Sequence, residues 1–398
     1  VTTGLYNNII GGLAGDAITT GDENIAIGVN TLTAETAGNK TIAIGGGALA
    51  AQNSSSDTDM FNVAVGYHAG NDITTGVQNV LIGGQAGDAI TDADFNVGVG
   101  HNALSVNVLG SQSVAIGHNA LLFQNPASAT DMANVAVGYG AGSQITTGVQ
   151  NTILGGSAGD ALTTGNENVA IGMEALTSDT QGKRSVAVGK SALLTQNLSS
   201  SANAYNTAVG YDSGRSVTTG VNNIIIGALA GDALTDADFN VAVGFQALTN
   251  DTLGSGSTAI GHHALQTQNF SSATNSLNVA VGYQAGKGVT TGIANTLVGN
   301  QAGDALTGGN NNVAIGHDAL GGEIEGDKNT AVGVGALQSQ SNSSSTDAEN
   351  TAVGFNAGLN HTTASLNTLF GAEAGKGITT GGGNTIVGHS GGTRNTDL

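Results

Sequence analysis

Apolar and polar positions along this chain of 398 residues follow a short pattern that recurs from end to end. The pattern is a five-residue core in which Asn is followed by an apolar residue, a small or apolar residue, a second apolar residue and Gly, as in "NVAVG" at 62–66. Apolar residues at alternate positions, bounded by turn-forming residues, predict a short β-strand rather than a turn of helix. The core occurs 22 times and begins at residues 7, 24, 41, 62, 79, 96, 113, 134, 151, 168, 185, 206, 223, 240, 257, 278, 295, 312, 329, 350, 367 and 384.

The starts of successive cores differ by 17, 17, 17 and 21 positions, so that a larger 72-residue unit of four cores repeats. A fixed period of this kind is the signature of a solenoid, in which each repeat stacks on its neighbours. Because so short a repeat cannot hold both a strand and a helix, we predict that each repeat is one coil with two short strands. The fold class is then an all-β parallel solenoid of about 22 coils, continuous over residues 1–398. At one strand spacing per coil its length would be on the order of 105 Å.

Two positions of the core hardly vary among the copies. The last residue is Gly in all 22 copies, including Gly66, Gly83, Gly100 and Gly117. The first residue is Asn in 18 copies, including Asn62, Asn79 and Asn96. We expect the stacked Asn side chains to form a ladder of hydrogen bonds between coils. The Gly of the recurring "TTG" stretches, as at 74–76, is expected to provide a positive φ angle in the turn.

The strand is predicted to be buried on both faces. In the copy at 62–66, Val63 and Val65 are predicted to fill the inside of the coil, and Ala64 between them is predicted to face outward. This middle position is Ala, Ile or Leu in most copies, which is too apolar for a face in water. We therefore expect it to pack against another chain. A parallel homotrimer about a shared axis is the simplest arrangement, and a dimer remains open.

The composition narrows the possible functions. With 65 Gly, one Pro and no Cys or Trp, the chain is held together neither by disulfides nor by a large aromatic core. Its net charge of −20 argues against binding to nucleic acid or to anionic membrane surfaces, and no stretch of 18 apolar residues is present to insert into a membrane. Because the chain begins at Val1 and neither end has a polar cap, we expect it to be a segment of a longer fibre with neighbouring segments.

The phrases "NVAVG", "SVAIG" and "NTAVG", each followed by a short step to Ala, resemble the heads of trimeric autotransporter adhesins. The longer stretch "NTAVGYDSG…VTTGVNNIIIGALAGDAL", which starts at 206, equally resembles the repeat shafts of trimeric tail-fibre proteins of phages and bacteria. The resemblance covers nearly the whole chain. It implies a left-handed parallel β-roll, a homotrimer, an extracellular, cell-surface or virion-surface location, and no enzymatic activity in the roll.

Recurring carboxylates are the first candidates for a cofactor. The segments "TDADF" at 91–95 and 235–239 place two carboxylates close together, as a calcium site does, although they lack a Gly-rich ligand loop. The weak calcium candidates are Asp92, Asp94, Asp236 and Asp238. A second set, within "GDA" stretches, is expected to consist of solvated turn residues or local caps and comprises Asp16, Asp88, Asp160, Asp232 and Asp304.

Histidines are the second candidates. His101 and His118 occupy the same position in successive coils and are expected to stack. A trimer would bring six such imidazoles together, which makes a metal site conceivable. Other coils have Tyr, Gly or Lys at this position, so the pattern favours no metal. His262 and His263 are expected to be surface residues.

In every 72-residue unit an aromatic residue follows the Gly of the core that comes after the longer connection, and these residues are Tyr67, Tyr139, Tyr211, Tyr283 and Phe355. Exposed aromatic rings could bind sugars by stacking. Their predicted spacing of roughly 19 Å is too wide for a continuous saccharide groove. We therefore expect them to pack over the adjacent longer connection or at the interface between chains.

The longer connections are Ser-rich and are expected to protrude once per unit. Each carries a Gln at the same place, namely Gln52, Gln124, Gln196, Gln268 and Gln340. They could contact a receptor or simply close the coil.

Two functions fit these observations. The first is a structural extracellular fibre or adhesin shaft that spaces or presents an adhesive tip, with the chain itself as its partner. The alternative is a module that binds a host-surface glycan or protein partner through the surface of the roll. An enzyme is disfavoured because catalysis needs a unique pair of groups in a cleft, whereas this repetition never breaks.

Overall fold

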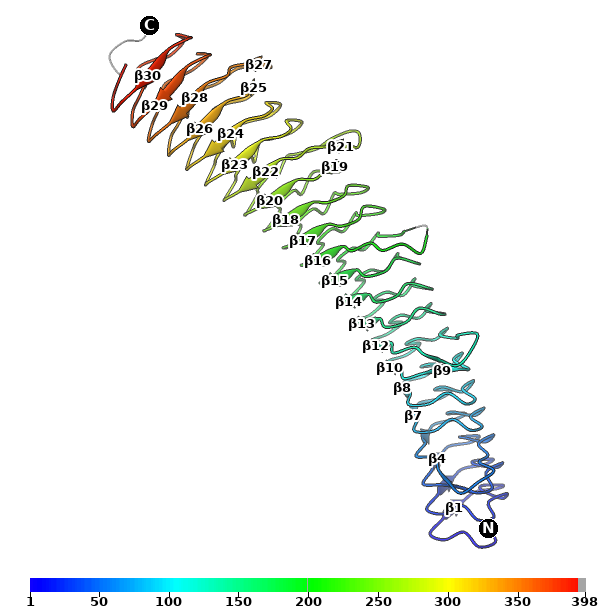
Figure 1. Ribbon diagram of the computed structural model, residues 1–398. Helices are drawn as coiled ribbons and strands as arrows, with labels where there is room; N and C mark the ends of the chain where they lie inside the picture. The colour runs from blue at the N-terminus through cyan, green and yellow to red at the C-terminus, as the bar shows by residue number, and fades with distance from the viewer. Residues whose placement is uncertain (199, 393–398) are drawn as a thin grey trace. The chain divides into compact units, whose positions relative to one another are not determined.

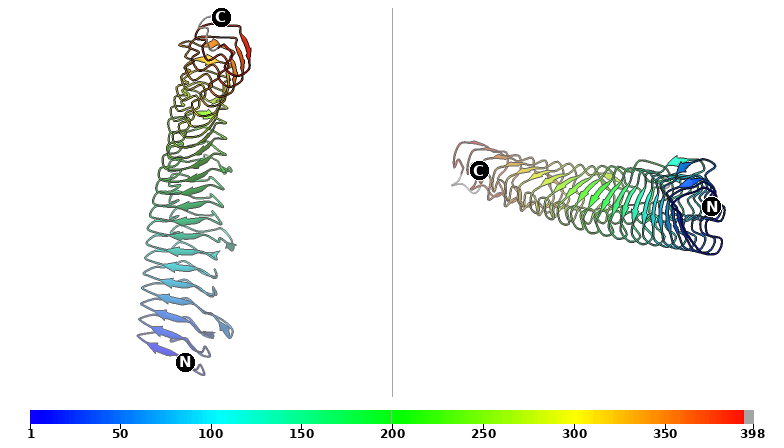
Figure 2. Two further views of the ribbon diagram at one scale, coloured as in Figure 1. Left: turned by 90° about the vertical axis from the view of Figure 1, so that its left-hand side faces the viewer. Right: turned by 90° about the horizontal axis from the view of Figure 1, so that it is seen from below.

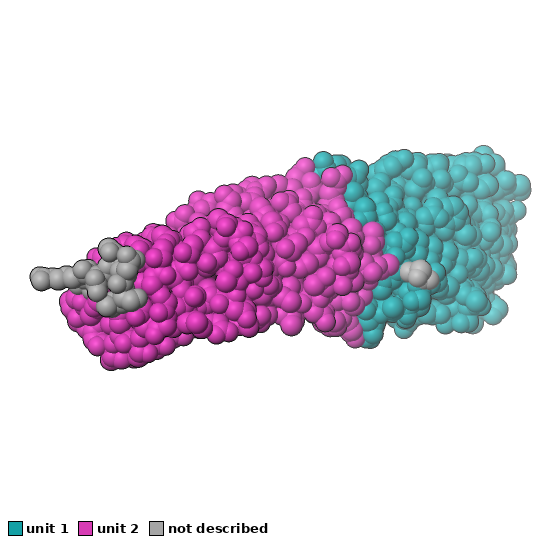
Figure 3. All heavy atoms as spheres, turned by 90° about the horizontal axis from the view of Figure 1, so that it is seen from above, with its two compact units in different colours: residues 1–204 teal, residues 205–398 magenta. Residues whose placement is uncertain are grey.

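The computed structural model describes residues 1–198 and 200–392, and these ranges contain strands and turns but no helix. The chain divides into two compact units, unit 1 (Val1–Ala204) and unit 2 (Tyr205–Leu398), which Figure 3 colours separately. Within each unit the chain winds into coils whose strands stack in parallel (Figures 1 and 2). The prediction of an all-β parallel solenoid with 22 strand-bearing coils is confirmed.

Each unit contributes eleven three-residue strands to the solenoid. Those of unit 1 are β1 (Asn8–Ile10), β2 (Ile25–Ile27), β4 (Ile42–Ile44), β6 (Val63–Val65), β7 (Val80–Ile82), β8 (Val97–Val99), β10 (Val114–Ile116), β12 (Val135–Val137), β13 (Thr152–Leu154), β14 (Val169–Ile171) and β15 (Val186–Val188). Those of unit 2 are β16 (Thr207–Val209), β17 (Ile224–Ile226), β18 (Val241–Val243), β20 (Thr258–Ile260), β22 (Val279–Val281), β23 (Thr296–Val298), β24 (Val313–Ile315), β26 (Thr330–Val332), β28 (Thr351–Val353), β29 (Thr368–Phe370) and β30 (Thr385–Val387).

The register of the stacked strands follows the sequence repeat. Strand β6 pairs with β7 so that Val63 lies beside Val80, at the offset of the shorter repeat. Across a longer connection the pairing follows the longer repeat instead, so that Ile42 of β4 lies beside Val63 of β6. The additional residues of the longer connection therefore lie outside the sheet and leave its register unchanged.

Within residues 1–198 and 200–392 a second strand is present only beside the longer connections, so the prediction of two strands in every coil is wrong. Two-residue parallel pairs form there, and they are β3 (Gly38–Asn39) with β5 (Thr58–Asp59), β9 (Gly110–Ser111) with β11 (Thr130–Asp131), β19 (Gly254–Ser255) with β21 (Thr274–Asn275), and β25 (Gly326–Asp327) with β27 (Thr346–Asp347). Elsewhere in residues 1–198 and 200–392 the coil closes through turns and bends without a second strand. In the coil of β6, positive φ angles occur at Gly66, His68, Gly70 and Gln78.

The invariant core glycines serve both the bend and the stacking. Gly155 has a φ angle of 138°, in a region that L-residues rarely occupy, and a Cβ atom there would lie 2.5 Å from the carbonyl oxygen of Gly172 in the next coil. The Gly of the "TTG" stretches was expected to provide a positive φ angle, but its role is different. Gly76 does not have a positive φ angle, but a Cβ atom on it would lie 2.5 Å from the carbonyl oxygen of Ala93. It is therefore required by the close approach of two coils.

The predicted asparagine ladder is present, and its members from Asn24 to Asn367 are fully buried. The side-chain oxygen of Asn62 accepts a hydrogen bond from the backbone N–H of Asn79 at 2.8 Å, and its amide nitrogen donates to the carbonyl oxygen of Gly76 at 2.7 Å. Asn79 repeats this arrangement toward Asn96, at 3.0 Å to its backbone N–H. Each amide thus links one coil to the next and also closes its own coil, which satisfies polar groups that would otherwise be buried without partners.

Two alternative combinations of side chains fill the coils. The residue four positions after the core Gly is either Gly or Leu, and the residue three positions further on, here called the inner turn position, changes with it. Coils with Gly carry Ile, Leu or Val at the inner turn position, and coils with Leu carry Glu, Asp, Asn or Gln. A Cβ atom on Gly70 would lie 2.9 Å from Leu81 and 3.0 Å from Ile73. Where Gly replaces Leu, the apolar residue at the inner turn position therefore compensates, and the filled volume of successive coils stays similar. Among the described coils, His361 is the one residue that departs from this pairing.

Candidate functional site

The branched side chains of the strand point outward, which reverses the predicted orientation. Ala64 is fully buried inside the coil, whereas Val63 and Val65 are only partly buried. The reason is space, because Ala69 and the inner turn residue Ile73 already fill the coil beside the strand. The outward face of each sheet therefore consists of the two flanking residues of each strand. We call it the outer sheet face.

The outer sheet face carries no charged residue at any of its 44 positions in the 22 strands, although the chain has 38 charged residues. The second outward residue is always Val, Ile, Leu or Phe, and the first is Val, Ile or Thr in every strand except β1. Apolar members that are at least 38% exposed are Ile10, Ile82, Ile116, Val135, Leu154, Ile224, Ile226, Ile260, Ile315, Phe370 and Val387. Exposed apolar surface this continuous is typical of a surface that another molecule covers.

The aromatic residues after the core Gly are at least half exposed: Tyr67, Tyr139, Tyr211, Tyr283 and Phe355. The expectation that they pack over the adjacent longer connection or at the interface between chains stays a prediction. In unit 1, Tyr139 takes part in ring stacking between coils. His118 lies between His101 and Tyr139, with ring centroids 5.4 Å apart in both pairs and the ring planes within 13°. The predicted stacking of the two histidines is confirmed.

Unit 2 repeats this stack of three rings with Phe245, His262 and Tyr283, at centroid distances of 5.2 and 5.4 Å. His262 is exposed, as expected. His263 is partly exposed, but its two ring nitrogens are buried without a hydrogen-bond partner, and this burial lowers the pKa of His263. Within residues 1–198 and 200–392, no three His, Cys, Asp or Glu side chains come together in a way that could hold a metal ion.

The calcium candidates have structural hydrogen bonds. Asp94 accepts a hydrogen bond from the backbone N–H of Val77 at 2.7 Å, and Asp238 accepts the equivalent bond from Val221 at 2.7 Å. These carboxylates therefore join successive coils. The other two candidates accept hydrogen bonds from threonine hydroxyls and are Asp92 and Asp236.

Four aspartates of the "GDA" stretches are half-buried rather than fully solvated. Their alternative role as local caps of the turn stays a prediction. Burial is the main cause that raises the pKa of the side chains of Asp88, Asp160, Asp232 and Asp304. In three of these coils a hydroxyl from the next coil opposes the shift. Thr249, for example, donates a hydrogen bond to Asp232, and this bond favours the charged form.

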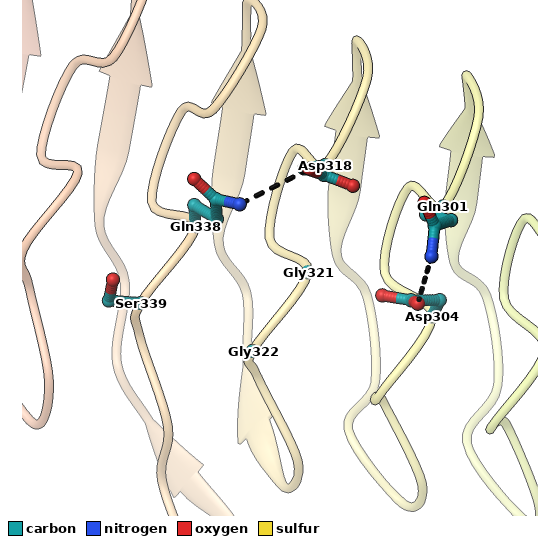
Figure 4. A pocket seen from close by; sticks show the side chains of 7 residues that line it. All are labelled: Gln301, Asp304, Asp318, Gly321, Gly322, Gln338 and Ser339. Atoms are coloured by element: carbon teal, nitrogen blue, oxygen red, sulfur yellow. Dashed lines mark hydrogen bonds between the residues drawn. The ribbon is translucent and has the colours of Figure 1, made fainter.

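Asp304 lacks this hydroxyl because residue 321 is Gly. A cavity of about 550 Å³ opens beside it, and Figure 4 shows its lining residues Gln301, Asp304, Asp318, Gly321, Gly322, Gln338 and Ser339. Gln338 donates a hydrogen bond to Asp318 at 3.2 Å, and Gln301 donates one to Asp304 at 3.5 Å. Burial, and then the nearby charge of Asp318, raises the pKa of Asp304. The cavity is a place where the repeat departs from its own pattern.

Replacing Gly321 with Thr is expected to restore the missing hydrogen bond and to narrow this cavity. The φ angle of Gly321 suits other residues, and a Cβ atom there would lie 3.5 Å from a carboxylate oxygen of Asp304. We expect the pKa of Asp304 to fall and the free energy of unfolding at pH 7 to rise by about 1 kcal/mol. Carboxyl titration by nuclear magnetic resonance (NMR) measures the first effect and chemical denaturation the second.

The reciprocal variant, Thr249→Gly, serves as the control, because it removes the hydroxyl bonded to Asp232. The pKa of Asp232 should rise in this variant. If both pKa values stayed unchanged, the hydroxyl would not be the group that distinguishes the two coils.

Buried carboxylates at the inner turn position were not predicted. Glu35 is fully buried, and one of its oxygens accepts backbone hydrogen bonds from Thr36, Ala37 and Gly38 at 2.7–3.1 Å. Its other oxygen accepts a bond from the side chain of Gln52 at 2.8 Å. Asp179 and Asp251 are buried in the same arrangement, with Gln196 and Gln268 as donors. Glu323 is also buried and accepts a backbone hydrogen bond from Gly326, but its other oxygen accepts one from the side chain of Asn342. The regular pairing of a carboxylate or Asn with a Gln in the next coil is the sequence signal that could have revealed them.

The recurring Gln residues of the longer connections lie in the core rather than in the protruding part. Gln52 is fully buried, and its side-chain oxygen accepts a hydrogen bond from Asn62 at 2.9 Å. Gln124, Gln196, Gln268 and Gln340 are buried in the same way. Residues 55–57 at the tip of the first longer connection are exposed. The Gln thus anchors each connection, and contact of the tips with a receptor stays a prediction.

No family model matches the chain, and no curated protein or solved structure matches it either. Residues 1–198 and 200–392 contain no helix that is long and apolar enough to cross a membrane.

Proposed function

We propose that the chain is a structural segment of an extracellular fibre and that it associates with copies of itself through the outer sheet face. The observation that carries this proposal is the complete lack of charge at the 44 outward strand positions, in a chain with a net charge of −20. Covering a branched side chain that is about 40% exposed returns roughly 1 kcal/mol. Many such contributions along a unit would stabilise a lasting association.

A parallel homotrimer is the proposed assembly. Its support is the resemblance of the "NVAVG" phrases to the heads of trimeric autotransporter adhesins and to tail-fibre shafts. In a parallel arrangement equivalent coils lie at the same level, so that each Val or Ile meets its own counterparts. The proposed location is accordingly a cell or virion surface, and the proposed role is to space or present an adhesive tip without catalysis.

The assembly is tested with a triple substitution on the outer sheet face, Ile82→Lys, Ile116→Lys and Ile260→Lys. The wild-type chain is expected to have three times its chain mass of 38.8 kDa by light scattering coupled to size-exclusion chromatography. The variant is expected to have the monomer mass and an unchanged circular dichroism spectrum, because the three side chains point away from the core.

The matched control places three lysines at exposed positions away from the outer sheet face, Thr75→Lys, Thr147→Lys and Thr291→Lys. This variant should keep the mass of the wild-type assembly. A wild-type chain that remained monomeric at micromolar concentration would refute the self-association, and a dimer mass would refute the trimer.

A second candidate is a module that binds a glycan or protein partner through the roll surface. The observation in its favour is the cavity at Asp304, where Gly321 interrupts a hydrogen bond that equivalent coils keep. This second candidate is tested on a glycan array. Specific binding of a saccharide to the chain would show that the solenoid binds a ligand in addition to acting as a spacer.

A further inference from the structure

The column of rings that stack from coil to coil is interrupted in the first part of unit 1, where two of its three positions hold no ring. The three-ring stack at His101, His118 and Tyr139 has its equivalents one 72-residue unit earlier at Val29, Gly46 and Tyr67. The central position, which is a histidine in the stacks of both units, is therefore a glycine here. No side chain separates Val29 from Tyr67 along this column.

A pocket of about 300 Å³ opens at this gap. Gly46 and Gly47 contribute only backbone to its lining, and Val29 and Tyr67 line it with side chains that are 61% and 65% exposed. The ring of His68 stacks on that of Tyr67, with a centroid distance of 4.1 Å and an interplanar angle of 17°. A Cβ atom on Gly47 would lie 2.6 Å from the His68 ring. The two glycines thus make room both for the pocket and for the paired rings beside it.

The lining combines an apolar surface with neutral hydrogen-bonding groups. Two amide side chains, Asn30 and Asn71, line the pocket together with the rings. Asn71 is held in place by a hydrogen bond from its amide nitrogen to the carbonyl oxygen of Gly47 at 2.9 Å. No Lys, Arg, Asp or Glu lines the pocket. A neutral ligand is therefore favoured over a phosphate or a metal ion, which would need charged groups.

We propose that this pocket binds a single neutral pyranose, such as the terminal sugar of a glycan. A pyranose presents C–H groups on one face, which suit the stacked rings and Val29, and hydroxyls at its rim, which suit the amides of Asn30 and Asn71. The volume is at the lower end of the range for ligand pockets and fits one ring rather than a chain of sugars. This differs from the repeated aromatic ladder considered from the sequence, because only one of the five cycles has Gly at the central position, namely Gly46.

The test uses saturation-transfer difference NMR on the full chain with four methyl glycosides, those of glucose, galactose, mannose and N-acetylglucosamine. We expect transfer from the protein to the ring protons of at least one of them. Gly46→His supplies the imidazole that His118 provides in the equivalent cycle, and should reduce the signal at least fivefold. A Cβ atom at residue 46 would have its nearest neighbour 3.6 Å away, so the substitution causes no clash at Cβ.

Two further variants separate the pocket from exposed aromatic rings in general. Tyr67→Ala should also reduce the signal at least fivefold, whereas Tyr139→Ala, at the equivalent position with its gap filled by His118, should leave it within twofold of the wild type. The proposal is overturned if none of the four glycosides gives a signal, or if Gly46→His leaves the signal unchanged. It does not rest on the proposed assembly, since the mass measurements above and these NMR signals can fail independently.

Discussion

Replacing Gly155 with Ala is expected to lower the free energy of unfolding of the surrounding coils by roughly 2–6 kcal/mol, the sum of backbone strain and overpacking. Gly155 has a φ angle of 138°, and the new Cβ atom would lie 2.5 Å from the carbonyl oxygen of Gly172. The strain and the overpacking each contribute about 1–3 kcal/mol. Because each coil contacts mainly its neighbours, the loss should be local. Hydrogen exchange of the amides of residues 135–188 measures it.

The neighbouring substitution Gly156→Ala is a matched control. Gly156 does not have a positive φ angle, and a Cβ atom there would meet no atom within 4 Å. We expect its effect to remain within about 0.5 kcal/mol. Equal exchange rates in the two variants would show that the stacked coils can separate enough to accept a side chain at the core glycine.

His361→Ile is expected to stabilise unit 2, and more so in acid. His361 occupies the inner turn position, where the preceding cycles have Val or Ile, and it is fully buried with both ring nitrogens lacking hydrogen-bond partners. Removing these unsatisfied groups should raise the free energy of unfolding at pH 7 by roughly 1–3 kcal/mol. Urea denaturation of both proteins at several pH values measures the difference.

The pH dependence has a definite sign. Burial lowers the pKa of His361 to about 4, below its ordinary value of 6.5, so the folded state favours the neutral imidazole. The wild type therefore loses stability as the pH falls from 6.5 to 4, by up to about 3 kcal/mol, and the advantage of the variant should grow by that amount. The half-buried aspartates act in the opposite sense but are the same in both proteins.

Removal of an exposed imidazole should not have this effect. His389 is exposed and belongs to the same unit, so His389→Ala serves as the control. An advantage of His361→Ile that did not change between pH 7 and pH 4 would contradict the assignment of His361 as a buried neutral group.

The period of the sequence was sufficient to predict the solenoid. Cores such as "NVAVG" at 62–66 recur at two fixed intervals, and the strands pair at those same offsets. The Asn ladder followed from the same regularity, because equal positions in stacked coils must become neighbours. The stacking of His101 on His118 was predictable for the same reason.

Side-chain orientation was not predictable from the alternation of residues. A short strand of this kind has one inward and two outward side chains, or the reverse, and both choices alternate equally well. The structure places Ala64 inside because Ala69 and Ile73 already occupy the coil. The burial of Glu35 and Gln52 was not predictable either, because turn residues of different coils become neighbours only after the coils have closed.

The sequence by itself determined the coil number, the parallel register and the positions that must be Gly or Asn, because a repeat fixes which residues become neighbours between coils. Tertiary structure alone decided what lies inside one coil and what faces out, because that depends on how turn residues fill the enclosed volume. It thereby identified the uncharged outer sheet face and the open space at Gly46 as the surfaces available to partners.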